Sequence, residues 1–100
     1  MDNNRIFIIF PQILMFSKTW CPYCAKTKKF FEAVGANYTV IETDEVRHGF
    51  FIGMAVEELT NQQTVPNIFI SGIHVGGSDV IEGMYKTGQL QKIADNLKKV

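Results

Sequence analysis

Hydrophobic residues recur with two different spacings along this 100-residue chain, and the spacings predict short strands separated by helices. Continuous or alternating apolar runs predict strands at residues 12–17, 37–42, 67–70 and 73–75. Apolar residues at helical spacing predict helices from Cys21 to about Val34 and over roughly 45–60. The same spacing predicts helices on either side of Gly88, at residues 80–85 and 90–97.

The order of these elements limits how they can be arranged. The first strand, helix and second strand form a β-α-β unit, which favours a parallel strand pair with a right-handed crossover. Ser71-Gly72 reads as a hairpin turn between the last two strands. The chain therefore belongs to the α/β class, with a small mixed sheet flanked by helices. Gly49 and Gly53 weaken the helix predicted at 45–60, so its start is poorly defined.

Composition indicates one small domain spanning residues 1–100. Hydrophobic residues make up 46% of the chain, and ten basic residues balance ten acidic ones. This balance offers no bulk attraction to nucleic acid or an anionic membrane, and no apolar run is long enough to span a bilayer. The apolar N-terminus is interrupted by Pro11-Gln12, and no small-residue cleavage site follows, so we interpret it as core and expect a cytoplasmic or similarly reducing location.

The only two cysteines lie in the sequence Cys21-Pro-Tyr-Cys24, between an apolar strand and a lysine-rich helix. This order is typical of a thioredoxin-like redox site. Pro22 suits the first helical position and so places Cys21 at the N-cap, where unpaired N–H groups and the helix dipole stabilise a thiolate. Lys18 adds positive charge. Cys24 lies further from the solvated tip, so we assign Cys21 as the nucleophile and Cys24 as the resolving thiol.

Two other interpretations of the cysteines are weaker. A tetrahedral zinc site needs about four ligands, and only His48 and His74 could complete it. Neither histidine has ligand-like spacing to a partner, so no metal is expected. Two unreactive cysteines would leave the placement at a helix start unexplained.

Two further motifs each have a structural and a functional interpretation. Pro66, in Thr64-Val-Pro66, stands before an apolar strand; an ordinary trans proline is the more frequent case, whereas a cis proline would leave Val65 free to pair with an extended peptide. In Gly76-Gly-Ser-Asp79, Ser78 or Asp79 can cap the following helix, with Asp79 at the N-cap and Glu82 at N3 the favoured arrangement. The alternative is a nest of N–H groups that binds a carboxylate, with Asp79 meeting an amine.

Together the three motifs resemble those of a dithiol glutaredoxin, over roughly residues 12–98. The resemblance implies a thioredoxin-like fold and a glutathione-dependent thiol–disulfide oxidoreductase, with glutathione as co-substrate. It implies cis geometry at Pro66, pairing of Val65 with the glutathione backbone and a monomeric protein. Partners would be glutathionylated or disulfide-bonded proteins and, indirectly, glutathione reductase. The implied glutathione-binding residues are Lys18, Tyr23, Gln63, Thr64, Val65, Pro66, Ser78 and Asp79.

The chain departs from the family pattern in three places. Gln63 stands where many members have Arg or Lys, and Gly53 stands where many have Gln. Both positions commonly serve the glycine carboxylate, so weaker glutathione binding is expected. Residues 1–11 are an N-terminal extension or a shortened first helix.

These departures leave alternative functions open. One is a redoxin reduced by a thioredoxin-reductase-type enzyme. Another is an iron–sulfur cluster carrier, which Pro22 disfavours within the family. A non-catalytic binding domain would leave the paired thiols unexplained.

Overall fold

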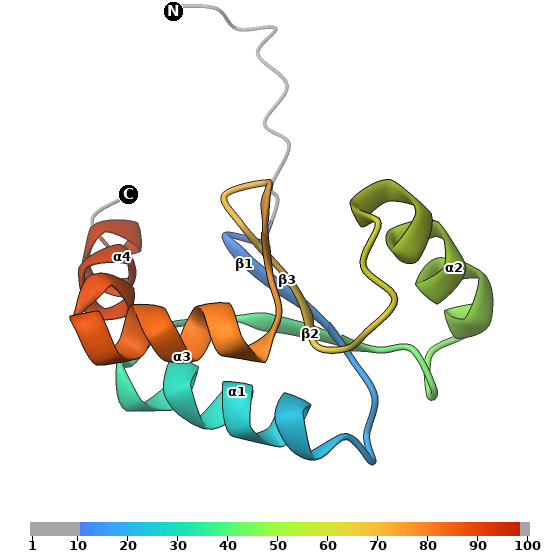
Figure 1. The fold of residues 1–100 in the computed structure, drawn as a ribbon, viewed down its shortest axis with the longest axis horizontal. Coiled ribbons are helices and arrows are strands. Elements are labelled where there is room, and N and C mark those ends of the chain that lie inside the picture. Colours follow the sequence, from blue (N-terminus) through green and yellow to red (C-terminus); the bar gives the residue numbers. More distant parts are fainter. Residues whose placement is uncertain (1–10, 99–100) are drawn as a thin grey trace, which may run out of the picture.

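A four-stranded mixed sheet organises the chain (Figure 1), in a computed structural model that describes residues 11–98. The strands lie in the order β2-β1-β3-β4. Their bounds are Ile13–Ser17 for β1, Thr39–Glu42 for β2, Asn67–Ile70 for β3 and Ile73–Gly76 for β4. The mixed four-stranded sheet predicted from the sequence is confirmed.

The pairing of the strands follows from their connections. β1 and β2 are parallel, as expected for a β-α-β unit, and Met15 pairs with Val40. β3 runs antiparallel to both β1 and β4. The turn between β3 and β4 places Ser71 and Gly72 at φ values of 52° and 79°, the left-handed geometry that a tight hairpin needs.

Four helices accompany the sheet in the described part of the chain. They are α1 at Pro22–Ala33, α2 at Gly49–Thr60, α3 at Ser78–Thr87 and α4 at Gln89–Leu97. The predicted end of α1 is confirmed, with Gly35 in the left-handed region just beyond it. Gly88 lies between α3 and α4, as predicted.

The predicted start of α2 is about four residues too early. The chain turns through residues 43–48 before the helix begins. Gly49 then passes so close to Thr43 that a Cβ atom on it would lie 1.9 Å from the Thr43 carbonyl oxygen. The close approach of Gly49 to Thr43 therefore sets the start of α2. The spacing of apolar residues along the sequence does not indicate this contact.

The core lies on one face of the sheet, under α1, α3 and α4. The buried cluster comprises Ile13, Met15, Ile68 and Ile70 from the strands and Phe31, Val34, Ile81, Leu90 and Ala94 from the helices. α2 stands apart from the other helices, on the far side of the strands (Figure 1). Among its twelve residues only Gly49 and Val56 are buried.

Two predictions concern the ends of the chain and membranes. The extension or shortened helix predicted for residues 1–11 falls almost entirely outside the described residues, which begin at Pro11. Within residues 11–98, no helix combines the length and apolarity needed to cross a bilayer.

Candidate active site

Cys21 ends the loop after β1 and forms the N-cap of α1, as predicted. Its extended backbone precedes Pro22 at the start of the helix, and its Sγ accepts a hydrogen bond from the Cys24 backbone N–H at 3.3 Å. The Cys21 N–H itself donates to the Lys18 carbonyl at 3.1 Å. Cys21 is 7% exposed as a residue, whereas Cys24 is 0% exposed.

Cys24 lies one turn into α1 and is fully buried. Removal from water disfavours its charged form, and burial, together with a hydrogen bond to Cys21, raises the pKa of the Cys24 thiol to about 11. The two sulfurs are not bonded to each other in the structure. The helix thus holds one sulfur at its N-cap and keeps the second, one turn later, as a protonated thiol.

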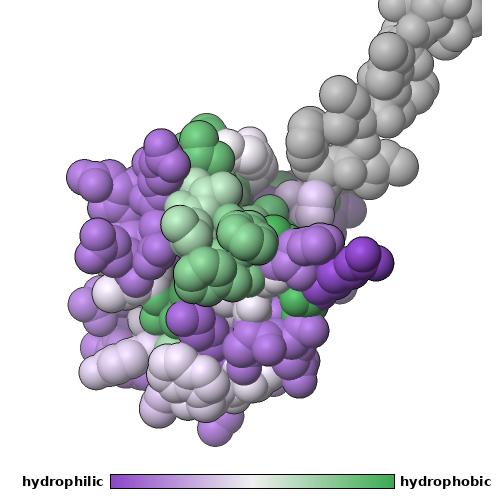
Figure 2. All heavy atoms as spheres, turned by 90° about the vertical axis from the view of Figure 1, so that its right-hand side faces the viewer, coloured by the Kyte–Doolittle hydropathy of each residue, from purple (hydrophilic) through white to green (hydrophobic). Residues whose placement is uncertain are grey.

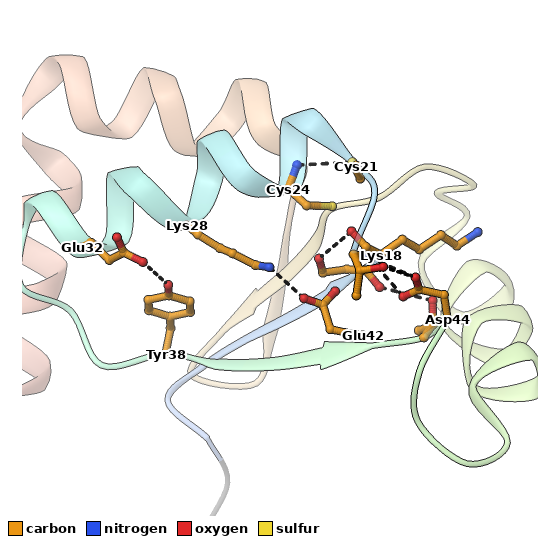
Figure 3. A network of polar contacts seen from close by, with 11 residues as sticks. Lys18, Cys21, Cys24, Lys28, Glu32, Tyr38, Glu42 and Asp44 are labelled. Atoms are coloured by element: carbon orange, nitrogen blue, oxygen red, sulfur yellow. Dashed lines mark hydrogen bonds and ion pairs between the residues drawn. The ribbon is translucent and has the colours of Figure 1, made fainter.

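The loop before Cys21 is anchored by Asp44, at the exit of β2 (Figure 3). The Asp44 carboxylate accepts hydrogen bonds from the Thr19 backbone N–H, at 3.0 Å, and from the Thr19 hydroxyl. These bonds hold the pKa of Asp44 below its ordinary value. The anchor fixes the segment between β1 and the nucleophile to the neighbouring strand.

A second loop, Thr64 to Pro66, faces Cys21 from the other side. The Val65–Pro66 peptide bond is cis, as the family resemblance implied and as the residues alone did not favour. The Cys21 Sγ lies 3.7 Å from the Val65 carbonyl oxygen and donates to it as a thiol. This contact places the nucleophile beside the backbone of the loop.

Gln62 holds this loop in shape, and sequence reasoning missed it. Its Nε2 donates to the carbonyls of Thr64 and Pro66, each at 3.0 Å, and its Oε1 lies 3.2 Å from His74 Nε2. The only available signal was a polar residue just before the Thr-Val-Pro sequence, which by itself indicates nothing about a loop brace.

A cleft of about 490 Å³ opens beside this loop and contains six of the eight predicted glutathione-binding residues. Its ten lining residues include Tyr23 from α1, residues of the loop that precedes β3, and the glycine pair before α3. The predicted residues among them are Tyr23, Thr64, Val65, Pro66, Ser78 and Asp79. Residues far apart in sequence therefore meet in one concave site next to Cys21.

The capping prediction for α3 is wrong. Gly77 occupies the N-cap and α3 begins at Ser78, so Asp79 lies in the first turn. Glu82 does not reach back to the cap, because its carboxylate binds Lys26 at 2.7 Å and Lys86 at 2.9 Å. The buried Ser78 Oγ has no hydrogen-bond partner among the described residues, which leaves it available at the edge of the cleft.

The remaining two predicted binding residues, Lys18 and Gln63, line a neighbouring cavity of about 670 Å³ between α2 and the active-site loops. Gly53 lines it as well. Gln62, Thr64 and Val65 border both hollows, so the cavity and the cleft meet at the loop that faces Cys21.

The two histidines lie away from the cysteines' chemistry. His48 is exposed before α2 and receives a hydrogen bond from Arg47 Nε at 3.2 Å. His74 packs against Phe69 and contacts Gln62. Within residues 11–98, no three His, Cys, Asp or Glu side chains form a group suited to a metal ion.

Comparison with known proteins gives consistent results. The family model described as glutaredoxin matches residues 13–75. A glutaredoxin of Ricinus communis is 46% identical over 90 residues, covering 90% of this chain and 88% of the relative. Glutaredoxin-C2 of Arabidopsis thaliana is 41% identical over 90 residues, covering 90% of this chain and 81% of the relative.

Solved structures agree with the sequence relatives. A buckwheat glutaredoxin–glutathione complex is similar with a TM-score of 0.80 and 40% identity, covering 86% of this chain and 78% of that chain. The reduced glutaredoxin C1 of Populus tremula x tremuloides is similar with a TM-score of 0.81 and 35% identity, covering 85% of this chain and 73% of that chain. The predicted thioredoxin-like fold is confirmed by these neighbours.

Proposed function

Because the chain belongs to the glutaredoxin family, whose members are glutathione-dependent thiol–disulfide oxidoreductases, we propose that Cys21 carries the nucleophilic step of that reaction and Cys24 the resolving step. The observation that carries this assignment is the asymmetry of the two sulfurs. Cys21 lies at the N-cap beside an open cleft, whereas Cys24 is buried with a raised pKa of about 11. Only the first sulfur combines a position next to the cleft wall, through Val65, with helix-dipole support for a thiolate.

With a glutathione mixed disulfide, the Cys21 thiolate attacks the glutathione sulfur. The disulfide bond of the substrate breaks, and the substrate thiolate leaves and takes up a proton. Cys21 now holds glutathione as a new disulfide. A second glutathione, as thiolate, attacks that glutathione sulfur, so oxidised glutathione departs and the Cys21 thiolate is restored.

With a protein disulfide, the Cys21 thiolate attacks one substrate sulfur, the substrate S–S bond breaks, and the other substrate sulfur is released as a thiolate that takes up a proton from water. Cys24 then completes the reaction from the mixed disulfide. Cys24 gives its proton to the departing substrate thiolate as its own sulfur attacks Cys21. The substrate leaves with two thiols, and the Cys21–Cys24 disulfide is then reduced by two glutathiones. The raised pKa of Cys24 supports this order, because a buried thiol does not attack external disulfides.

The cleft supports a placement for glutathione. An extended peptide lying along it would pair with the Val65 backbone and present its cysteine to Cys21, 3.7 Å from the Val65 carbonyl. The γ-glutamyl end would lie at Ser78 and Asp79, where Asp79 meets the amine and the N-terminal N–H groups of α3 meet the carboxylate. Tyr23, Thr64 and Pro66 would form the walls of the cleft.

The glycine carboxylate would lie toward Lys18 and Gln63 in this placement. A cation at position 63 should strengthen glutathione binding, since a charge-assisted hydrogen bond contributes about 1.5–3 kcal/mol when sheltered and less when exposed. Gln63→Arg should therefore lower the KM for a glutathionylated substrate. An unchanged KM would refute this role for position 63.

The cellular setting is part of the proposal. Glutathionylated or disulfide-bonded proteins are the proposed substrates, and glutathione reductase is the proposed indirect partner. We propose that the protein acts as a monomeric single domain in the cytoplasm. Neutral net charge supports partners that are neither nucleic acid nor membrane.

Turnover of a glutathione mixed disulfide, coupled to glutathione reductase and NADPH, tests the assignment. Cys21→Ser should abolish turnover. Cys24→Ser should keep turnover of the mixed disulfide and lose reduction of protein disulfides. Retained activity in Cys21→Ser, or wild-type turnover no faster than free glutathione alone, would overturn the proposal.

A further inference from the structure

Large apolar side chains are gathered on the face of the molecule that carries α2, outside the core. We call Trp20, Val46, Phe50, Phe51 and Met54 the α2 patch; each is between 40% and 72% exposed. Figure 2 shows hydrophobic side chains gathered over α2 and bordered by hydrophilic ones. Exposed apolar residues that cluster in this way mark interaction sites more often than scattered ones do.

The α2 patch is hollowed and adjoins the active site. All five of its residues line the cavity of about 670 Å³, whose other walls include Phe16 and Val56. Its volume is that of a pocket for a ligand of moderate size. The cavity shares Thr64 and Val65 with the glutathione cleft. Since Cys21 Sγ lies 3.7 Å from the Val65 carbonyl oxygen, a substrate that reacts with Cys21 is held close to the rim of the cavity.

The chemistry of the cavity does not match glutathione alone. Glutathione carries no bulky apolar side chain, whereas the cavity is walled by aromatic residues and the adaptable thioether of Met54. Glu57 lines the cavity without an ion-pair partner among the described residues, and Asp44 lines it too. Lys18 and Gln63 line the cavity as well and are the proposed partners of the glycine carboxylate, so an acidic client side chain is disfavoured by the apolar walls and not by a uniform negative charge.

We propose that the α2 patch binds a bulky apolar side chain of the client protein, close in sequence to the glutathionylated cysteine whose thiolate leaves when Cys21 attacks the glutathione sulfur. This inference rests on the proposed function and adds the substrate class to it. The client cysteine, bonded to the glutathione sulfur beside Cys21 and Val65, lies at the edge of the glutathione cleft, and the neighbouring apolar side chain enters the cavity under α2. Clients with such a residue are selected over those with a small or acidic one.

Glutathionylated peptides of one length test the proposal on the full chain. In the series, a single Phe replaces Ala at each position near the cysteine in turn. We expect kcat/KM for the best Phe peptide to exceed that of the all-Ala peptide by about tenfold, as for burial of an aromatic ring in a half-open pocket. A Glu at the same position should give a value below the all-Ala peptide.

Two variants of α2 separate docking from helix stability. Phe51→Ala removes a ring from the α2 patch and should reduce the Phe-to-Ala ratio by severalfold. Leu59→Ala is the matched control, since Leu59 is 82% exposed on the same helix but does not line the cavity. It should retain the ratio and the turnover of a glutathionylated small thiol. Helix content measured by circular dichroism should be equal in both.

The possible results separate this inference from the proposed function. No turnover of any glutathionylated substrate would refute the function itself. Fast turnover with equal kcat/KM for the Phe and Ala peptides would overturn the inference alone. A dimer in sedimentation that Phe51→Ala dissociates would assign the α2 patch to a second copy. A preference for the Phe peptide that appears only in the Ile8→Ser/Phe10→Ser variant would assign the α2 patch to the chain's own N-terminal segment. Either the dimer result or this one would overturn client docking.

Discussion

At the scale of single residues, the two cysteines differ because of where one helix begins. Pro22 starts α1, so the sulfur before it lies at the N-terminal N–H groups of the helix, and the sulfur one turn later is fully enclosed. Cys24 donates its backbone N–H to Cys21 Sγ and so supports the partner sulfur directly. Chemical identity is the same at both positions, and geometry alone divides their roles.

This difference predicts how the thiols react with an alkylating agent. At neutral pH, iodoacetamide should modify Cys21 and leave Cys24 largely unreacted, because the Cys24 pKa of about 11 keeps it protonated. In Cys21→Ser, burial alone should still hold the pKa of Cys24 above that of a free thiol, so its thiolate absorbance should appear at a higher pH than that of a small thiol measured alongside. Rapid alkylation of Cys24 in that variant at pH 7 would contradict its burial and its resolving role.

Gln62 gives a second prediction at this scale. Gln62→Ala removes two hydrogen bonds to the carbonyls of Thr64 and Pro66, so the loop facing Cys21 should lose its fixed shape. Two such bonds together contribute about 1–3 kcal/mol, and KM for a glutathionylated substrate should rise by severalfold. The Thr60 hydroxyl accepts from Asn67 Nδ2 at 2.9 Å and from the Gln62 backbone N–H at 3.3 Å, so it supports the same segment without bonding to the loop carbonyls or to the Gln62 side chain.

Thr60→Ala therefore serves as the control for Gln62→Ala. It should lower stability and leave KM near the wild-type value. An equal rise in KM for both variants would show that general loosening of this region, and not the loop brace, controls substrate binding.

At the scale of elements, local signals in the sequence predicted most of the fold. Apolar runs located the strands, Pro22 and Gly35 bounded α1, and Ser71-Gly72 defined the hairpin. Each of these signals acts within a few residues, so a single sequence contains it.

The predictions that failed depend on contacts between distant segments. The start of α2 is set by Gly49 against Thr43, and Asp79 loses the N-cap of α3 to Gly77. The sequence placed Ser78 and Asp79 beside the site only through family resemblance, and the role of Gln62 carried no local signal at all. Tertiary contacts decide such positions, and they leave no periodic pattern.

Glycines within helices give a prediction at this scale. Gly83, inside α3, has nothing within 4 Å of the place where a Cβ would stand. Gly83→Ala should therefore raise the free energy of unfolding by about 0.5–1 kcal/mol, since alanine loses less backbone entropy in a helix. Urea unfolding followed by circular dichroism measures the change.

Gly49→Ala is the opposing case in α2. Its Cβ would lie 1.9 Å from the Thr43 carbonyl oxygen, so backbone must move and the variant should unfold at a lower urea concentration. If Gly49→Ala were more stable than the wild type, the backbone of residues 43–48 would move at little cost, and the close approach of Gly49 to Thr43 would not determine where α2 begins.

At the scale of the whole molecule, helices on the core face of the sheet are joined by charge as well as by apolar packing. Lys26 of α1 and Lys86 of α3 both bind the Glu82 carboxylate, and this pairing lowers the pKa of Glu82 to about 2 from 4.5. A carboxylate with a lowered pKa in the folded state stabilises the protein above its unfolded pKa. The contribution is lost as the pH falls from about 4.5 toward 2.

Glu82→Gln should therefore flatten the acid side of the stability profile. The urea midpoint of the wild type should fall more steeply between pH 5 and pH 3 than that of the variant, because only the wild type has this carboxylate to protonate. Glu58→Gln, on α2, removes the same charge from a residue without an ion pair among the described residues and should keep the wild-type slope. Because α1 carries both cysteines and α3 borders the glutathione cleft, the KM of the wild type should also rise as the pH falls through this range, whereas the KM of Glu82→Gln, which lacks the Lys26–Glu82 pair at every pH, should show no such rise. Parallel stability profiles for all three proteins would show that packing alone holds these helices together.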